Sequence, residues 1–133
     1  MRFKTFYRLV FLAAVIVDFM DYGITQVGFS RFSPWFEANP YVRILMGSGV
    51  NAYLASSIVF SVTIAFVLGA YYVLKGYLDE QPYSGGMREV GGYLWNLSTT
   101  NARDLAVFAC LALVVVLIVQ HLFGFLTWLT LFV

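Results

Sequence analysis

Three long apolar runs limit what this chain can fold into more than any other feature of its sequence. They cover about residues 7–27, 51–74 and 105–132. Each reaches the roughly 20 residues that a helix needs to cross the hydrocarbon core of a bilayer. Apolar residues make up 61% of the chain and charged residues only 11%, which is far from the usage of soluble proteins. We therefore expect an all-α integral membrane protein with three transmembrane helices, built as a single membrane domain over residues 1–133.

The connection between the first two runs contains a segment of its own. Pro34 and Pro40 punctuate it, and an apolar stretch at about residues 40–47 follows that is far too short to span a membrane. This stretch predicts a short interfacial helix, with a re-entrant segment as the alternative. The third run is longer than a perpendicular crossing needs, so its helix tilts, leaves the bilayer past Gly124 or changes direction there.

Positive residues are distributed unevenly around the predicted spans. Six lie before or at the start of the first span or in the second connection, and two lie in the first connection: Arg2, Lys4, Arg8, Lys75, Arg88 and Arg103, against Arg31 and Arg43. Since Lys and Arg collect on the cytoplasmic side, we expect a cell-membrane protein with its amino terminus in the cytoplasm and its carboxyl terminus outside. The net charge of +1 and the scattered basic residues exclude nucleic acid as a partner.

Two acids interrupt the first apolar run. Asp18 and Asp21 lie three residues apart in its middle, and each costs about 2.5 to 3.5 kcal/mol at the centre of an inserted helix. The ten Leu, Ile, Val and Phe residues of the run offset about 3 to 6 kcal/mol of that cost. This helix is therefore marginal on its own.

Periodicity indicates how the acids are accommodated. Ala14, Asp18, Asp21, Thr25 and Gly28 follow alternating steps of four and three residues, which is one face of a helix. This face must point to other helices, to a partner chain or to a water-filled cavity, because lipid offers nothing to ionised oxygen atoms. We predict that both carboxylates point into protein.

Matching depths across the spans predicts a polar layer. Asp21 and His121 lie at similar outward offsets from the midpoints of the first and third spans, and Ser57 and Ser61 fall near the same depth. The predicted intramembrane cluster, joined by a serine hydroxyl, consists of Asp18, Asp21, Gln120 and His121. A second feature of the middle span is a stripe of small residues at steps of four, which lets helix backbones approach closely: Ser57, Ser61, Ala65 and Gly69.

The sequence limits the chemistry of such a cluster. Asp, Glu, Asn and His are ligand types for metal ions, but the chain has one histidine and no Glu-x-x-His spacing. We expect no cofactor and no metal site of its own, and leave open a metal site shared with a partner. No Gly-x-Ser-x-Gly motif accompanies His121, so we do not expect the chain to be catalytic by itself. The acids remain open to two readings, as structural groups that fix helix pairing or as a proton or ion pathway.

One part of the chain resembles a known family. The order of Asp18, Thr25 and Gly28, followed by Glu37-Ala38-Asn39-Pro40 before a short apolar segment, is similar to a family of small, mostly archaeal multi-pass membrane proteins. Its members carry an intramembrane Asp and a Glu-x-Asn-Pro loop, and the resemblance covers about residues 18–54. The family has no established function. The resemblance implies that the loop motif forms a defined corner: Glu37, Asn39 and Pro40.

The residues of this loop support the same expectation. Asn39-Pro40 is a turn starter, and Glu37 lies close enough in sequence to Arg31 and Arg43 for an ion pair at the interface. The tryptophans are typical of an aromatic belt at the membrane–water boundary: Trp35, Trp95 and Trp128.

These features lead to an expected function. Three helices enclose little volume, the first is marginal alone, and the acidic face and the small-residue stripe offer two packing surfaces. We expect an accessory subunit that packs against and stabilises the membrane domain of a larger enzyme complex, with other membrane subunits and lipid as partners. In size and helix count it resembles accessory subunits of respiratory complexes and of copper-dependent ammonia or methane monooxygenases. The alternative is a proton or ion pathway through Asp18 and Asp21.

Overall fold

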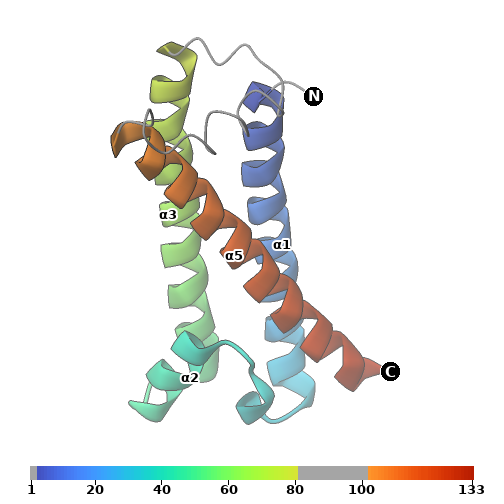
Figure 1. Cartoon of the computed structure of the whole chain (residues 1–133). Helices are drawn as coiled ribbons and strands as arrows, with labels where there is room; N and C mark the ends of the chain where they lie inside the picture. Colours follow the sequence, from blue (N-terminus) through green and yellow to red (C-terminus); the bar gives the residue numbers. More distant parts are fainter. Residues whose placement is uncertain (1–2, 81–101) are drawn as a thin grey trace.

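The fold is all-helical (Figure 1). The computed structural model describes residues 3–80 and 102–133. These form α1 (Phe3–Arg31), the 3-10 turn η1 (Pro34–Phe36), α2 (Pro40–Gly47), α3 (Ala52–Glu80) and α5 (Ala102–Phe132). The helices α1, α3 and α5 are long and apolar enough to cross a membrane. The predicted fold class, three spanning helices with a short helix between the first and second, is confirmed.

The long helices extend past the predicted spans. Whereas the apolar runs predict ends near residues 27 and 74, α1 continues to Arg31 and α3 to Glu80, because a helix does not stop where the apolar residues stop. The rest of the predicted second connection, with Arg88 and Trp95, lies outside the described residues. The third run is one continuous helix through Gly124, about 46 Å long. In Figure 1 it runs obliquely across the other two and does not change direction at Gly124, while its tilt in the membrane stays a prediction.

The helix α1 is the centre of the bundle. It packs along both α3 and α5, whereas α3 and α5 touch each other at few places. Figure 1 shows the start of α1 and the end of α3 at one end of the molecule, which we call the N-terminal end. The short helix α2 and the carboxyl terminus lie at the other, which we call the α2 end. The helices α1 and α5 therefore run in the same direction.

Parallel α1 and α5 pack in one continuous register. The buried residues on the facing side of each helix recur at steps of three and four, with one gap in α5: Tyr7, Phe11, Ala14, Asp18, Asp21, Thr25 and Gly28 on α1, and Val107, Leu111, Val114, His121, Gly124 and Trp128 on α5. Such spacing keeps one seam of each helix facing the other. The predicted inward face of α1 is thus confirmed in full, and it continues toward the N-terminal end.

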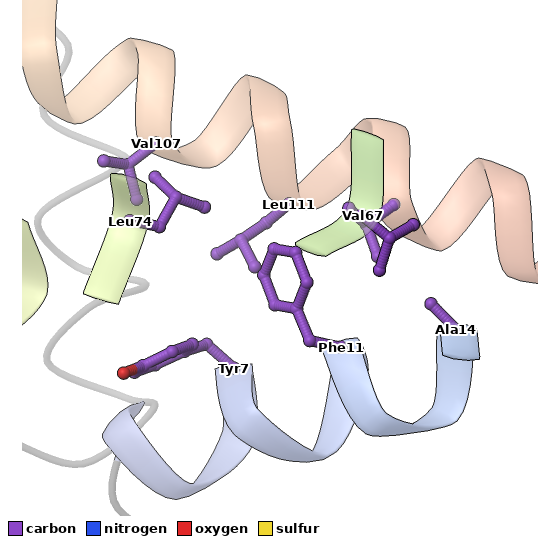
Figure 2. Packing of buried hydrophobic residues seen from close by; sticks show 8 residues of the cluster. Tyr7, Phe11, Ala14, Val67, Leu74, Val107 and Leu111 are labelled. Atoms are coloured by element: carbon purple, nitrogen blue, oxygen red, sulfur yellow. The ribbon is translucent and has the colours of Figure 1, made fainter. Parts of the chain in front are cut away.

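The seam is apolar in its first half. Figure 2 shows Tyr7, Phe11 and Ala14 of α1 facing Val107 and Leu111 of α5, with side chains of α3 closing the cluster. The α3 side chains in this cluster are Val67 and Leu74.

Polar contacts hold α3 to α1 in the other half. The Tyr22 hydroxyl and Ser57 Oγ lie 3.0 Å apart, and Gln26 donates to Ser56 Oγ at 2.6 Å. The Tyr22 ring also stacks on Phe60, with centroids 4.4 Å apart. These contacts fix how far α3 can slide along α1.

The segment between α1 and α3 forms the defined corner that the loop motif predicts. Asn39 caps α2, accepting from the Tyr41 backbone N–H at 3.0 Å, and Pro40 is the first helical residue. Pro is favoured there because its missing N–H would have no partner in the first turn. The helix α2 packs against the start of α3, with Val42 buried in a cluster that includes Phe29 and Ala55.

The assignment of Trp128 to an interfacial belt is wrong. Its side chain is fully buried, where it meets Phe29 edge-to-face with centroids 5.6 Å apart. The ring lies on Gly28, and a Cβ atom at that position would overlap it. Trp35 is exposed, and its place in an aromatic belt stays a prediction.

We expect Gly28→Ala to loosen the α1–α5 seam. The added methyl group forces the Trp128 ring out of its place, and overpacking of this kind costs about 1 to 3 kcal/mol. Gly23→Ala is the matched control, because a Cβ there meets no atom within 4 Å. Unfolding in mild detergent, followed by tryptophan fluorescence, measures both. Equal stability of the two variants would contradict the close contact.

Candidate functional site

The two intramembrane acids are buried in protein. Asp18 is 2% exposed and Asp21 is 6% exposed, so both carboxylates point away from lipid, as predicted. They lie near the middle of α1, on the same face as Ala14 and Thr25.

A single histidine lies between the two acids. On one side of the ring, His121 Nδ1 is 2.7 Å from Asp21 Oδ2. On the other side, His121 Nε2 is 3.4 Å from Asp18 Oδ1. The first distance is that of a charge-assisted hydrogen bond, and the second is longer than an ordinary one. We call these three residues the Asp–His–Asp cluster.

Two carboxylate oxygen atoms of this cluster have no hydrogen-bond partner. Asp18 Oδ2 and Asp21 Oδ1 are both buried and unpaired. A buried polar atom without a partner costs free energy, so these atoms point to something that binds there.

A small cavity adjoins the cluster. Its volume is about 20 Å³, which is enough for one water molecule. Oxygen- and nitrogen-bearing side chains from four segments line it: Asp18, Asp21, Tyr22 and Thr25 of α1, Glu37 and Asn39 of the corner, Ser56 of α3 and His121 of α5. No lysine or arginine is among the described residues that line it.

Close approach of α5 allows this geometry. Gly124 lies one turn after His121, and a Cβ atom there would be 2.7 Å from Asp21 Oδ1. The carboxylate therefore rests directly on the α5 backbone. A side chain at position 124 would push Asp21 away from the ring.

Glu37 closes the cavity toward the α2 end. Its Oε1 accepts from the Asn39 backbone N–H at 2.7 Å, and its Oε2 accepts from Trp128 Nε1 at 3.0 Å. Burial raises the pKa of Glu37 above its ordinary value, and the charge of Asp21 acts in the same direction, although the two hydrogen bonds oppose both. The expected ion pair with Arg31 or Arg43 is replaced by this inward arrangement, because the corner turns the carboxylate toward Trp128.

The structure separates some residues that the sequence grouped. Gln120 lies beside a different cavity, together with Tyr41 and Thr63, and its placement in the polar cluster is wrong. The reason is geometric, since adjacent residues of a helix point about 100° apart. Of the predicted serines, Ser57 bonds to Tyr22 and Ser61 is exposed, and the serine that lines the cavity is Ser56.

The small-residue stripe on α3 also lies away from the site. Ser61, Ala65 and Gly69 are exposed on the outer surface of this chain, and a Cβ atom on Gly69 would meet no atom within 4 Å. The close helix contacts within the chain are instead made at Gly28 and Gly124.

The contributors to the site that sequence reasoning missed include Ser56 and Trp128. Ser56 could have been found from its spacing, because it lies one turn before Phe60 on the face of α3 that meets Tyr22. Trp128 could have been found from the register, because it lies seven residues after His121 and so on the same face of α5.

The geometry of the cluster favours proton chemistry over metal chemistry. Both ring nitrogens of His121 face carboxylates on opposite sides of the ring, so the three side chains do not converge on one point. Among the described residues, no group of three or more His, Cys, Asp and Glu side chains could hold a metal ion. An imidazole ring can accept a proton at one nitrogen while it donates a proton from the other.

Comparisons with protein-family models, with curated proteins and with solved structures found no match to this chain. The resemblance of residues 18–54 to the Glu-x-Asn-Pro family therefore stays a prediction.

We expect His121→Ala to destabilise the bundle strongly. It leaves two buried carboxylates without their shared partner, and breaking a buried ionic contact by removing one partner costs about 3 to 5 kcal/mol. Gln120→Ala is the control, on the adjacent residue that lines another cavity, and should cost about 1 kcal/mol or less. Unfolding in detergent micelles measures both. A similar loss in the two variants would show that the cluster does not hold the helices together.

Proposed function

We propose that this protein binds and transfers protons inside the membrane, at the Asp–His–Asp cluster. The observation that carries the proposal is the pair of buried carboxylate oxygens without partners beside a polar cavity: Asp18 Oδ2 and Asp21 Oδ1.

The charges around the cavity support uptake of protons. Three carboxylates and one imidazole line it, and the described lining residues include no other cationic group. With every carboxylate ionised and the imidazole protonated, the net charge would be −2, which is costly in a low-dielectric site. Binding of a proton neutralises part of this charge and gives an unpaired oxygen atom its hydrogen.

The cluster can also move a proton. A proton on Asp21 passes to His121 Nδ1 across 2.7 Å, and the proton on Nε2 passes to Asp18 Oδ1 across 3.4 Å. In this step the O–H bond of Asp21 and the N–H bond at Nε2 break, while N–H and O–H bonds form at Nδ1 and at Asp18. Charge is conserved, and no oxidant or other reactant takes part. The second distance must shorten for transfer, so Asp18 is the slower partner.

We expect Asp18→Asn and Asp21→Asn to remove proton binding while the helices stay folded. An amide keeps the shape and hydrogen-bonding capacity of a neutral acid but does not titrate. Infrared difference spectra of the protein in bilayers, between acid and alkaline buffers, should show a carboxyl C=O band that each variant weakens. Ser61→Ala, on the exposed face of α3, should leave the band unchanged. Identical spectra of the parent protein and both Asn variants would refute the proposal.

A second proposal is that the protein works as a subunit of a larger membrane complex. The supporting observation is the limited contact between α3 and α5, which leaves two apolar hollows of about 390 Å³ and 430 Å³, with Phe66 lining both. Together with the exposed stripe on α3, they offer a partner helix a surface on this side of the bundle.

The subunit role predicts stable association with other membrane proteins. Purification in mild detergent through a carboxyl-terminal tag should recover partners in fixed proportion, identified by mass spectrometry. Bulky residues in the stripe, as in Ala65→Leu with Gly69→Leu, should reduce the recovery of partners. Leu113→Ala, which changes the lining of the 390 Å³ hollow, tests whether a partner also contacts that surface and should reduce the recovery as well. Recovery of the chain alone, as one uniform species, would contradict this role.

The orientation in the membrane belongs to the same set of proposals. The distribution of Lys and Arg supports a cytoplasmic N-terminal end and an outside α2 end.

A further inference from the structure

Apart from the Tyr7 hydroxyl, the buried polar side chains that the structure describes lie in one half of the bundle. They lie between the middle of α1 and the α2 end: Asp18, Asp21, Thr25, Glu37, Asn39, Ser56 and His121. The polar region therefore reaches one end of the molecule and stops near its middle.

The other half is closed by apolar packing. Beyond Asp18, the next buried residues along the seam are Ala14 and Phe11, opposite Val114 and Leu111. Figure 2 shows Phe11, Ala14 and Leu111 between α1 and α5, with the Val67 side chain of α3 beside them. The next buried hydroxyl group on α1, that of Tyr7, is about 16 Å along the helix from Asp18. No described buried acid, histidine or amide side chain bridges this distance.

Glu37 lies on the α2 side of the polar half. It precedes α2, is 3% exposed and lines the cavity. The groups that face the cavity with it are Asp18, Asp21 and Tyr22 of α1 and His121 of α5, while α3 presents the neutral Ser56. Arg31 and Arg43 do not line the cavity.

The chemistry of Glu37 suits the exchange of protons. Burial, with the charge of Asp21, raises its pKa, so it holds a proton at higher pH than a surface glutamate does. The cavity between Glu37 and the cluster has room for one water molecule, which can accept a proton from one carboxyl and donate one to another. The hydrogen bonds from Asn39 and Trp128 stabilise the ionised form after the proton has left.

We infer that the Asp–His–Asp cluster exchanges protons with one side of the membrane only, the side at which α2 lies, and that Glu37 carries them between that surface and the cavity. The inference rests on the proposed function and adds the side of the membrane from which protons reach the cluster and the residue through which they pass. In each transfer the O–H bond of Glu37 breaks, an O–H bond forms at Asp21 through the intervening water, and Glu37 takes up a proton again from the surface.

The single histidine of the chain makes this sidedness measurable. His121 is the only histidine, so ¹⁵N-histidine labelling reports on the cluster alone. The protein is reconstituted into sealed vesicles, and its orientation is selected through a Ser33→Cys substitution in a Cys110→Ala background. Vesicles captured through that cysteine present the α2 end outward. The inner pH is held by a strong buffer while the outer pH is changed, and histidine NMR and the infrared carboxyl band are recorded.

The inference predicts that the cluster follows the pH on the α2 side. With the α2 end outward, both signals should change with the outer pH and not with the inner pH, and inverted vesicles should show the reverse. Response to both sides would overturn one-sided access while leaving proton binding intact. Response to the far side alone would also overturn it. Signals that follow neither pH would refute the proposed function itself, so the two failures can be told apart.

Glu37 is tested by the rate of the same response. Glu37→Gln should slow the change of the His121 signal at least tenfold, because glutamine cannot release and regain a proton. Glu37→Asp restores a carboxyl group and should recover much of the rate. If Glu37 only supported the fold, a titrating carboxyl group at this position would not be needed for a fast response. Glu80→Gln, at the opposite end of α3, is the control. An unchanged rate in Glu37→Gln, with the fold intact by circular dichroism, would exclude Glu37 as the entry group.

Stability provides an independent measure of the same group. A carboxyl group whose pKa is raised by folding stabilises the folded state fully below its ordinary value of 4.5, and this contribution is lost as the pH rises through the raised pKa. Glu37→Gln should therefore reduce the fall in stability that the parent protein shows above that pH. A parallel dependence on pH in both proteins would contradict the raised pKa.

Discussion

The contact of His121 with two buried carboxylates constrains the rest of this structure. Charges removed from water cost several kcal/mol each unless protein groups offset the loss, and lipid cannot supply such groups. The helices α1 and α5 must therefore run side by side in the register that brings the ring between Asp18 and Asp21. A shift of one residue along α5 would turn His121 by about 100° and leave both acids without it.

The same register organises the apolar parts of the bundle. Gly28 and Gly124 let α5 approach α1 at the α2 end, and the apolar layers around Phe11 and Val114 continue the seam toward the N-terminal end. The helix α3 adds to this pair without joining its seam in the polar half, where it is held by Tyr22 and Gln26. The polar site and its apolar closure thus follow from one helix pair, and the one-sided access that we infer follows from how the seam is divided between them.

Much of this arrangement follows from the sequence, and the rest does not for identifiable reasons. The spans follow from the length of the apolar runs, and the inward face of α1 follows from the period that its two acids and Thr25 reveal. The rotation of α5 cannot be determined in this way, because α5 is apolar on all sides and offers Gln120 and His121 as adjacent polar residues. The inward turn of Glu37 depends on backbone geometry at the corner and on a tryptophan that lies 91 residues later in the chain.

The unpaired oxygen atoms of the cluster favour the proposed proton-binding role over a purely structural one. Helix pairing needs no titrating group at these positions, because asparagine can form hydrogen bonds with less desolvation and apolar residues often pack at least as stably as buried ions. Acids at 18 and 21 instead leave Asp18 Oδ2 and Asp21 Oδ1 buried without partners, next to a cavity large enough for one water molecule. A free-energy cost of this kind, next to a polar cavity and bounded by apolar packing on the other side, is what we expect of a group that binds and releases a proton.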